Sequence, residues 1–78
     1  MDIVNIDQTK PFTTKDGSEI RELLAHRNSS VRNQTLAEAR LPPEVSTTAH
    51  HHVKTEEIYY VLEGRGEMCL DGERRPVG

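Results

Sequence analysis

The chain has little of what a hydrophobic core is made from. Only 33% of its 78 residues are hydrophobic, and the aromatic residues are Phe12, Tyr59 and Tyr60, with no tryptophan. A chain of this length is one domain at most, and so small a domain buries only about 60% of the surface that its unfolded form exposes. We therefore expect stability to come from a further source, such as a metal ion, a partner subunit or additional sequence.

The chain also lacks a concentration of positive charge and any long apolar run. Its ten lysine and arginine residues are scattered among thirteen acidic residues, which gives a net charge of −3. Nucleic-acid binding needs a continuous basic face, so we expect no nucleic-acid partner. No apolar run approaches the ~20 residues that cross a bilayer, and the N-terminal residues lack the segments of a secretory signal. No membrane partner is expected either.

A single cysteine, Cys69, excludes an internal disulfide bond. This usage fits a reducing compartment, and we expect a cytoplasmic protein. Cys69 falls in a predicted strand, where we expect it to pack as a small hydrophobic side chain. The sequence places no base beside it that would make it a nucleophile. His26 is expected on the surface or edge of its segment rather than in a site.

The first half of the chain predicts an N-terminal arm followed by strands. A short strand is expected at residues 3–6 and a turn at Asp16-Gly17. Residues 18–27 have apolar side chains at helical spacing but are too few for an unsupported helix, so we expect a helical turn that runs into a strand. In residues 33–41 apolar and charged side chains alternate, which predicts a strand that buries the face of Ala37, Ala39 and Leu41.

The second half predicts strands joined by short turns. Residues 45–52 can be extended, residues 57–63 form the strongest predicted strand, and a further strand covers residues 67–70. Asp71-Gly72 is a dipeptide typical of a two-residue hairpin turn, and the last six residues show the start of a returning strand. Short strands linked by such turns indicate an antiparallel all-β fold, either a barrel or a sandwich.

A set of candidate metal ligands lies on the hairpin predicted for these strands. Side chains alternate between the two faces of a strand, so His50 and His52 share one face. If residues 53–56 connect the strands, His52 lies opposite Glu57, and directly opposed residues point to the same side of a sheet. A three-residue connection would place Glu56 there instead. A histidine run is also compatible with a solvated loop, a surface patch or a remnant of an engineered tag.

The same hairpin assigns roles to the neighbouring side chains. Tyr59 and Val61 continue the ligand face as a wall, while Ile58, Tyr60 and Leu62 form the opposite face, available to a second sheet or a second subunit. Two histidines and one carboxylate are the ligands of non-haem iron oxygenases and also suit manganese or zinc. Because a metal selects neutral imidazole and ionised carboxylate, we expect its affinity to fall as the pH drops through the histidine range.

The segment from His50 to Gly64 resembles the first motif of the cupin family. That motif consists of His-x-His, three or four residues, Glu, six residues and Gly, and it is matched here by His50, His52, Glu57 and Gly64. Six residues separate Glu57 from Gly64, as in the motif, so the resemblance selects Glu57 rather than Glu56 as the ligand.

The resemblance covers roughly residues 36–78, and residues 1–35 are similar to the start of small single-domain cupins in a less specific way. The motif usually opens with a glycine six positions before its first histidine, where this chain has Glu44. We expect a turn that tolerates this change.

The resemblance implies an all-β, antiparallel cupin-type barrel, that is, a double-stranded β-helix with a jelly-roll-like arrangement. We expect a single domain over residues 1–78, with an N-terminal arm at 1–17 and the barrel portion at 18–78. In the family a second motif supplies a further histidine ligand and the closing strands, and this chain ends at Gly78 before that motif. We therefore expect a truncated chain with an incomplete barrel, weaker metal binding, and a homodimer that pairs the unpaired strand edges by exchanging strands.

Cupins include dioxygenases, sugar isomerases and epimerases. The resemblance implies one divalent transition metal, whether Fe, Mn, Zn, Ni or Cu, at His50, His52 and Glu57. We expect a metal-binding small cupin, in first place a metal-dependent enzyme of the dioxygenase or isomerase type that acts on a small oxygen-rich molecule, with Tyr59 and Glu56 as candidate general bases. The alternatives are a non-catalytic module that binds a small molecule or sugar, and an inactive truncated fragment.

Overall fold

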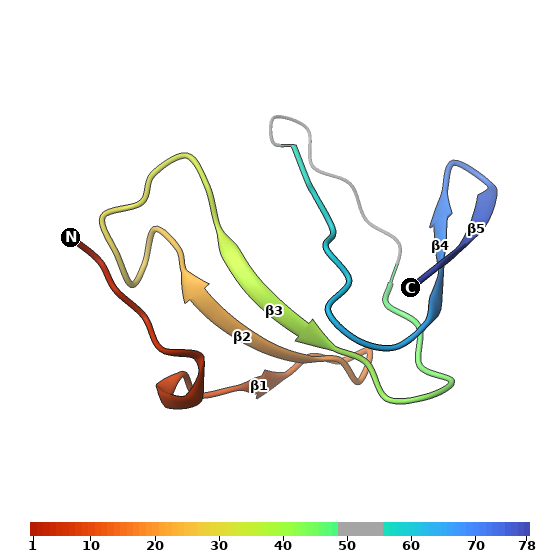
Figure 1. Ribbon diagram of the computed structural model, residues 1–78, viewed down its shortest axis with the longest axis horizontal. Helices are drawn as coiled ribbons and strands as arrows, with labels where there is room; N and C mark the ends of the chain where they lie inside the picture. Colours follow the sequence, from red (N-terminus) through yellow and green to blue (C-terminus); the bar gives the residue numbers. More distant parts are fainter. Residues whose placement is uncertain (49–55) are drawn as a thin grey trace.

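The computed structural model describes residues 1–48 and 56–78 of the chain. Its strands form two antiparallel sheets, one in the order β1-β2-β3 and one made of β4-β5 (Figure 1). The elements are the 3-10 helix η1 (Ile6–Gln8) and the strands β1 (Phe12–Thr13), β2 (Glu19–Leu24), β3 (Leu36–Arg40), β4 (Gly66–Leu70) and β5 (Glu73–Val77). The antiparallel all-β class expected from the sequence is confirmed, and no helix within the described ranges has the length and apolar character to cross a membrane.

Near the N-terminus, the strand expected at residues 3–6 does not form, and a short 3-10 turn begins at Ile6. The Asn5 side chain accepts a hydrogen bond of 2.8 Å from the Asp7 backbone N–H, and the Thr9 N–H closes the turn with a bond of 3.1 Å to the Ile6 carbonyl. An asparagine at this position satisfies a donor at the start of a helical turn. The expected strand was wrong because this local capping outweighs the strand preference of a few apolar residues.

Strand β2 is formed by residues that were expected to begin as a helical turn. It pairs with β1 on one side, with Phe12 opposite Ile20, and with β3 on the other, with Ile20 opposite Ala39. The helical spacing was misleading, because a helix of about ten residues is marginal alone, whereas a central strand satisfies its backbone groups on both sides. The turn follows the strand instead of preceding it, and there the Asn28 N–H bonds to the Ala25 carbonyl at 3.2 Å.

Strand β3 alternates as expected, but the burial of its two faces is reversed. Ala37 and Ala39 are exposed, and Leu41 just beyond the strand is 46% exposed, whereas the Glu38 side chain is only 15% exposed. The expectation assumed a second layer over the alanine face. Within residues 1–48 and 56–78 no layer covers that face, so the alternation shows which side chains share a face but not which face is buried.

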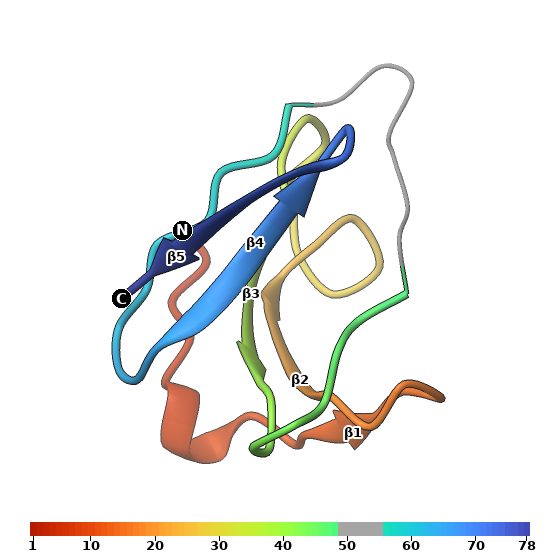
Figure 2. The ribbon, with the colours of Figure 1, turned by 90° about the vertical axis from the view of Figure 1, so that its right-hand side faces the viewer.

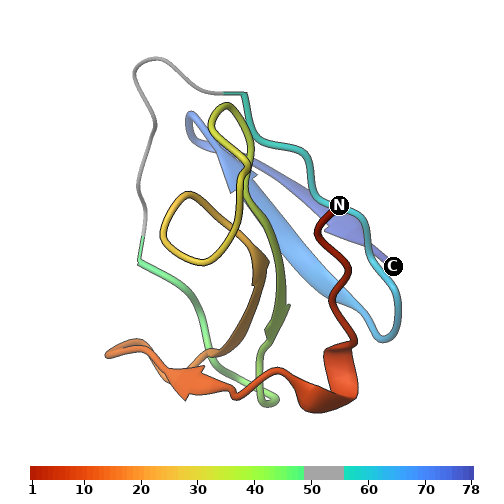
Figure 3. The same cartoon turned by 90° about the vertical axis from the view of Figure 1, so that its left-hand side faces the viewer.

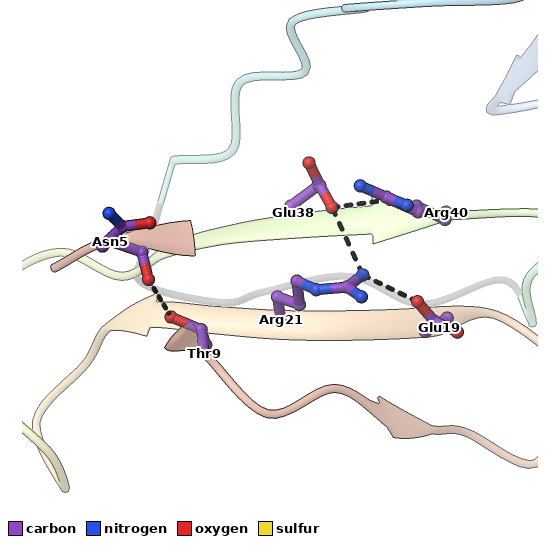
Figure 4. Close-up of polar contacts among 6 residues, drawn as sticks. All are labelled: Asn5, Thr9, Glu19, Arg21, Glu38 and Arg40. Atoms are coloured by element: carbon purple, nitrogen blue, oxygen red, sulfur yellow. Dashed lines mark hydrogen bonds and ion pairs between the residues drawn. The ribbon is translucent and has the colours of Figure 1, made fainter. Parts of the chain in front are cut away.

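The less exposed face of β3 carries a cluster of ion pairs. Glu38 Oε1 lies 2.8 Å from Arg40 Nε and 3.6 Å from Arg21 Nη1, and Arg21 also bonds to Glu19 at 2.7 Å (Figure 4). Residues 6–11 of the N-terminal arm line a cleft together with Arg21 and Arg40. Pairs of this kind that keep contact with solvent contribute about 0–1 kcal/mol each. The ion pairs of Glu38 therefore add little to the stability of the sheet.

Strands β4 and β5 form the hairpin that the Asp71-Gly72 dipeptide predicts. Leu70 pairs with Glu73, so the loop contains two residues. Both have positive φ, 50° at Asp71 and 79° at Gly72, which is the conformation of a type I′ turn and the reason for this dipeptide. The start of a returning strand is confirmed, and it extends over the whole of β5.

Residues 57–63, the strongest strand predicted from the sequence, are not a strand in the structure. Their apolar side chains are exposed, by 90% at Ile58, 84% at Tyr60 and 73% at Leu62. In Figure 1 this segment runs between the two sheets. A strand is stabilised by pairing and by packing of its side chains, not by the intrinsic preference of its residues. No described strand pairs with this segment, and that explains the difference.

The chain buries very little of itself. Ala25 and Ser18, at 6% and 3% exposure, are the buried residues of the described ranges, and the accessible surface totals 7566 Å². A folded monomer of 8.8 kDa exposes about 4,800 Å². Figures 2 and 3 show the β4-β5 hairpin and the three-stranded sheet as separate layers. The described strands therefore form two open sheets, in agreement with an incomplete barrel.

Candidate metal centre

The structure describes one of the three expected metal ligands. His50 and His52 lie outside the described residues, so their part in the site stays a prediction. Glu57 is described and exposed, and its Oε1 accepts a hydrogen bond of 2.8 Å from the Tyr59 hydroxyl. Side chains two residues apart share a face of an extended chain, and these two side chains do meet. A contact between carboxylate and phenol thus orients the Glu57 side chain.

The state of Tyr59 follows from its surroundings. Partial burial raises the pKa of the phenol because it disfavours the ionised form, and the hydrogen bond and negative charge of Glu57 raise it further. The hydroxyl therefore stays protonated at neutral pH and donates to the carboxylate. Carboxylates that bind metals are commonly held by such hydrogen bonds. This role makes Tyr59 a poor general base, although the sequence made it one of the two candidates for that role.

The chain turns sharply before the expected ligands. The Val45 N–H bonds to the Pro42 carbonyl at 3.3 Å, and Glu44 between them has φ of 65°. This is the left-handed region, which side chains other than glycine adopt at a cost. Glu44 occupies the position where the cupin motif usually has glycine, so the backbone explains that preference and shows that this chain tolerates the exception.

Replacing Glu44 with glycine is expected to stabilise the protein by up to about 1 kcal/mol. Relief of the left-handed conformation is worth about 1–2 kcal/mol, and the greater freedom of glycine in the unfolded chain offsets about half of it. The midpoint of chemical unfolding measures this change. Glu63→Gly is the control, because Glu63 is absent from the positive-φ residues of the described chain and the substitution should be neutral or destabilising. A loss of stability in Glu44→Gly would contradict the account of this turn.

The end of the motif is also explained by the backbone. Gly64 has φ of 89°, and open space surrounds the position where a side chain would begin. Glycine is therefore required here by conformation and not by packing. This turn redirects the chain from the Glu57 segment toward β4.

The remaining candidate residues lie on the surface. His26 is exposed in the turn after β2, as expected. Cys69 is exposed on β4, with its sulfur 3.9 Å from Glu67 Oε1, so its expected packing as a small hydrophobic side chain was wrong. The reason is again the open face of the hairpin. Within residues 1–48 and 56–78 no group of three or more histidine, cysteine, aspartate or glutamate side chains could hold a metal ion.

Comparison with known proteins places this sequence among the cupins. The family model described as a cupin domain matches residues 37–78, which is more than half of the chain. An uncharacterized protein of Methanocaldococcus jannaschii is 53% identical over 71 residues, which cover 91% of this chain and 57% of that protein. A protein of Streptomyces cyaneus named polyketide synthase CurC is 32% identical over 75 residues, or 96% of this chain and 48% of its own length.

A third relative, an uncharacterized protein of Aquifex aeolicus, is 27% identical over 75 residues, with 85% of this chain and 62% of that protein covered. The chain thus spans about half the length of the curated relatives that it matches. No solved structure matches the chain.

Proposed function

We propose that this chain, which belongs to the cupin domain family, is a metal-binding small cupin in which His50, His52 and Glu57 hold one divalent transition metal. The hydrogen bond from Tyr59 to Glu57 carries the proposal, because it orients the carboxylate at the motif position where a ligand is expected. Two imidazole nitrogens and one carboxylate oxygen suit Fe, Mn, Zn, Ni or Cu. This donor chemistry fits the metal that the family implies.

The reaction that we propose is of the dioxygenase or isomerase type, on a small oxygen-rich molecule. When bound, the metal supplies a Lewis acid or a redox centre. Of the protein's own groups, Tyr59 keeps its proton on the bond to Glu57, and the exposed carboxylate of Glu56 is the candidate to take a proton from a substrate. One relative is named a polyketide synthase. Polyketides are rich in carbonyl oxygens, which supports a substrate of this class.

Metal-dependent turnover separates an enzyme from a binding module. The protein is loaded with each of the five metals in turn and mixed with oxygen-rich small molecules, while dioxygen uptake and isomer formation are followed. Turnover that appears with one metal and disappears in His52→Ala supports the enzyme. Binding of a sugar or another small molecule without turnover, for every metal, would show the non-catalytic module instead, and neither binding nor turnover would show an inactive fragment.

Replacing Tyr59 with phenylalanine is expected to weaken metal binding about 10- to 100-fold, the usual cost of losing a partner that orients a ligand. The change removes one oxygen and with it the bond to Glu57. Tyr60→Phe is the matched control, since it removes a hydroxyl from the next residue of the chain, which is 84% exposed. Competition titration against a metal-sensitive dye measures both affinities, and equal values for the two variants would contradict the role of Tyr59.

We also propose that two copies of the chain associate as a homodimer in the cytoplasm. The uncovered surface and the exposed apolar segment at residues 58–62 support the dimer. The single cysteine supports a reducing compartment.

A further inference from the structure

Asp16 connects two parts of the chain that are far apart in sequence. It lies in the turn between β1 and β2, and its Oδ1 accepts hydrogen bonds from the Thr14 hydroxyl, the Ser18 hydroxyl at 2.8 Å and the Ser18 N–H at 3.1 Å. Ser18 is the most buried polar residue of the described chain, at 3% exposure. These bonds fix the orientation of the Asp16 side chain. Led by the bond from Thr14, they also hold the pKa of its carboxyl well below the usual value.

The second carboxylate oxygen of Asp16 reaches outside its own turn. Asp16 Oδ2 accepts a hydrogen bond of 3.2 Å from the backbone N–H of Thr48, which is 32 residues later in the chain. Val45 lies beside the same turn, because one of its methyl groups is 3.5 Å from the position where a side chain at Gly17 would begin. The segment from Val45 to Thr48 thus runs beside the turn and is bonded to it at Thr48.

The held segment leads directly to the proposed ligands. His50 follows Thr48 by two residues, and two residues of chain reach at most about 7 Å. Fixing the Thr48 backbone therefore restricts where the first histidine of the motif can lie. The geometry points to Asp16 as a positioning residue for the metal centre, which connects the β1–β2 turn to the backbone just before His50. The inference rests on the proposed metal site.

Asp2 is a matched control for Asp16, because it is a second aspartate whose carboxylate joins two distant parts of the chain. Asp2 Oδ2 accepts a hydrogen bond of 3.0 Å from the Ser30 N–H and another from the Ser30 hydroxyl, 28 residues away. It has the same chemistry as Asp16 and also joins distant segments. Because it holds the N-terminus against the loop after β2, it contacts nothing that leads to the ligands.

The test compares metal binding in Asp16→Asn and Asp2→Asn. Asparagine retains one acceptor for the turn but presents an NH₂ group to the Thr48 N–H, so the long-range bond is lost. Titration with Mn²⁺ and with Zn²⁺ is expected to show affinity about 10- to 100-fold lower in Asp16→Asn and unchanged in Asp2→Asn. Faster hydrogen exchange of the Thr48 amide, with the amides of β2 and β3 unaffected, should accompany the loss.

A second pair of variants keeps the test decisive if Asp16→Asn does not fold. Thr48→Pro removes the N–H and leaves the Asp16 turn intact, whereas Thr47→Pro introduces the same ring one residue earlier. Weaker binding in Thr48→Pro alone supports the inference. Wild-type affinity in both Asp16→Asn and Thr48→Pro overturns it while the metal site stands. A wild-type protein that binds neither ion overturns the metal site, and the positioning role with it.

Discussion

Replacing Glu57 with glutamine is expected to weaken metal binding by at least about 100-fold, which exceeds the cost of losing an outer-shell partner. An amide carries no negative charge and is a poorer ligand for a transition metal than a carboxylate. Its NH₂ group also competes for the place of the ligating oxygen, and the Tyr59 hydroxyl loses its charged acceptor. Isothermal titration with the metal found in the purified protein measures the change.

Glu56→Gln is the control, because Glu56 is the neighbouring carboxylate that a shorter connection would have made the ligand. Both residues are exposed, so neither substitution should unfold the protein, and circular dichroism verifies this. We expect Glu56→Gln to bind the metal as the wild type does. If Glu56→Gln loses the metal and Glu57→Gln retains it, the spacing to Gly64 has selected the wrong carboxylate.

Replacing Ile58 with serine is expected to convert a dimeric protein into a monomer. The accessible surface of 7566 Å² exceeds that of a compact monomer of this mass by about 2,800 Å². That excess is ample for an interface, since stable complexes bury about 800 Å² on each partner. Ile58 is 90% exposed in the single chain. Tyr60 and Leu62, which follow it on the same predicted face, are 84% and 73% exposed.

A symmetric interface doubles the effect of one substitution, because the same residue is lost from both copies. Each buried isoleucine contributes about 1.5–3 kcal/mol. The dimer should therefore dissociate at least about 100-fold more readily. Analytical ultracentrifugation across a range of concentrations measures this. Ile3→Ser is the control, since Ile3 is 82% exposed but lies in the N-terminal arm, and it should leave the dimer unchanged. A wild-type protein that is monomeric at every concentration would contradict the dimer.

The parts of the fold that local chemistry decides could be predicted from the sequence. The Asp71-Gly72 turn was predicted because two adjacent residues with positive φ need those side chains. Alternation in β3 was predicted because it depends only on the geometry of a strand. In the candidate site, the motif spacing singled out Glu57, and its meeting with Tyr59 agrees with the expected common face.

What depends on distant partners could not be predicted. The segment at 18–27 was expected to begin as a helical turn, because nothing local shows that β1 and β3 pair with it on both sides. Residues 57–63 were expected to form a strand, and the alanine face of β3 to be buried, because both patterns assume a covering layer. The sequence indicates only a turn at Asp16, since no local signal points to a bond with a backbone N–H that is 32 residues away.

Elemental analysis tests most directly whether the motif residues hold a metal ion. Untagged protein is purified without chelators, and its metal content is measured beside that of His52→Ala. We expect about one transition-metal ion per chain in the wild type and almost none in the variant. A wild-type protein with no more metal than the variant would contradict the account, and the chain would then be a cupin without a metal centre.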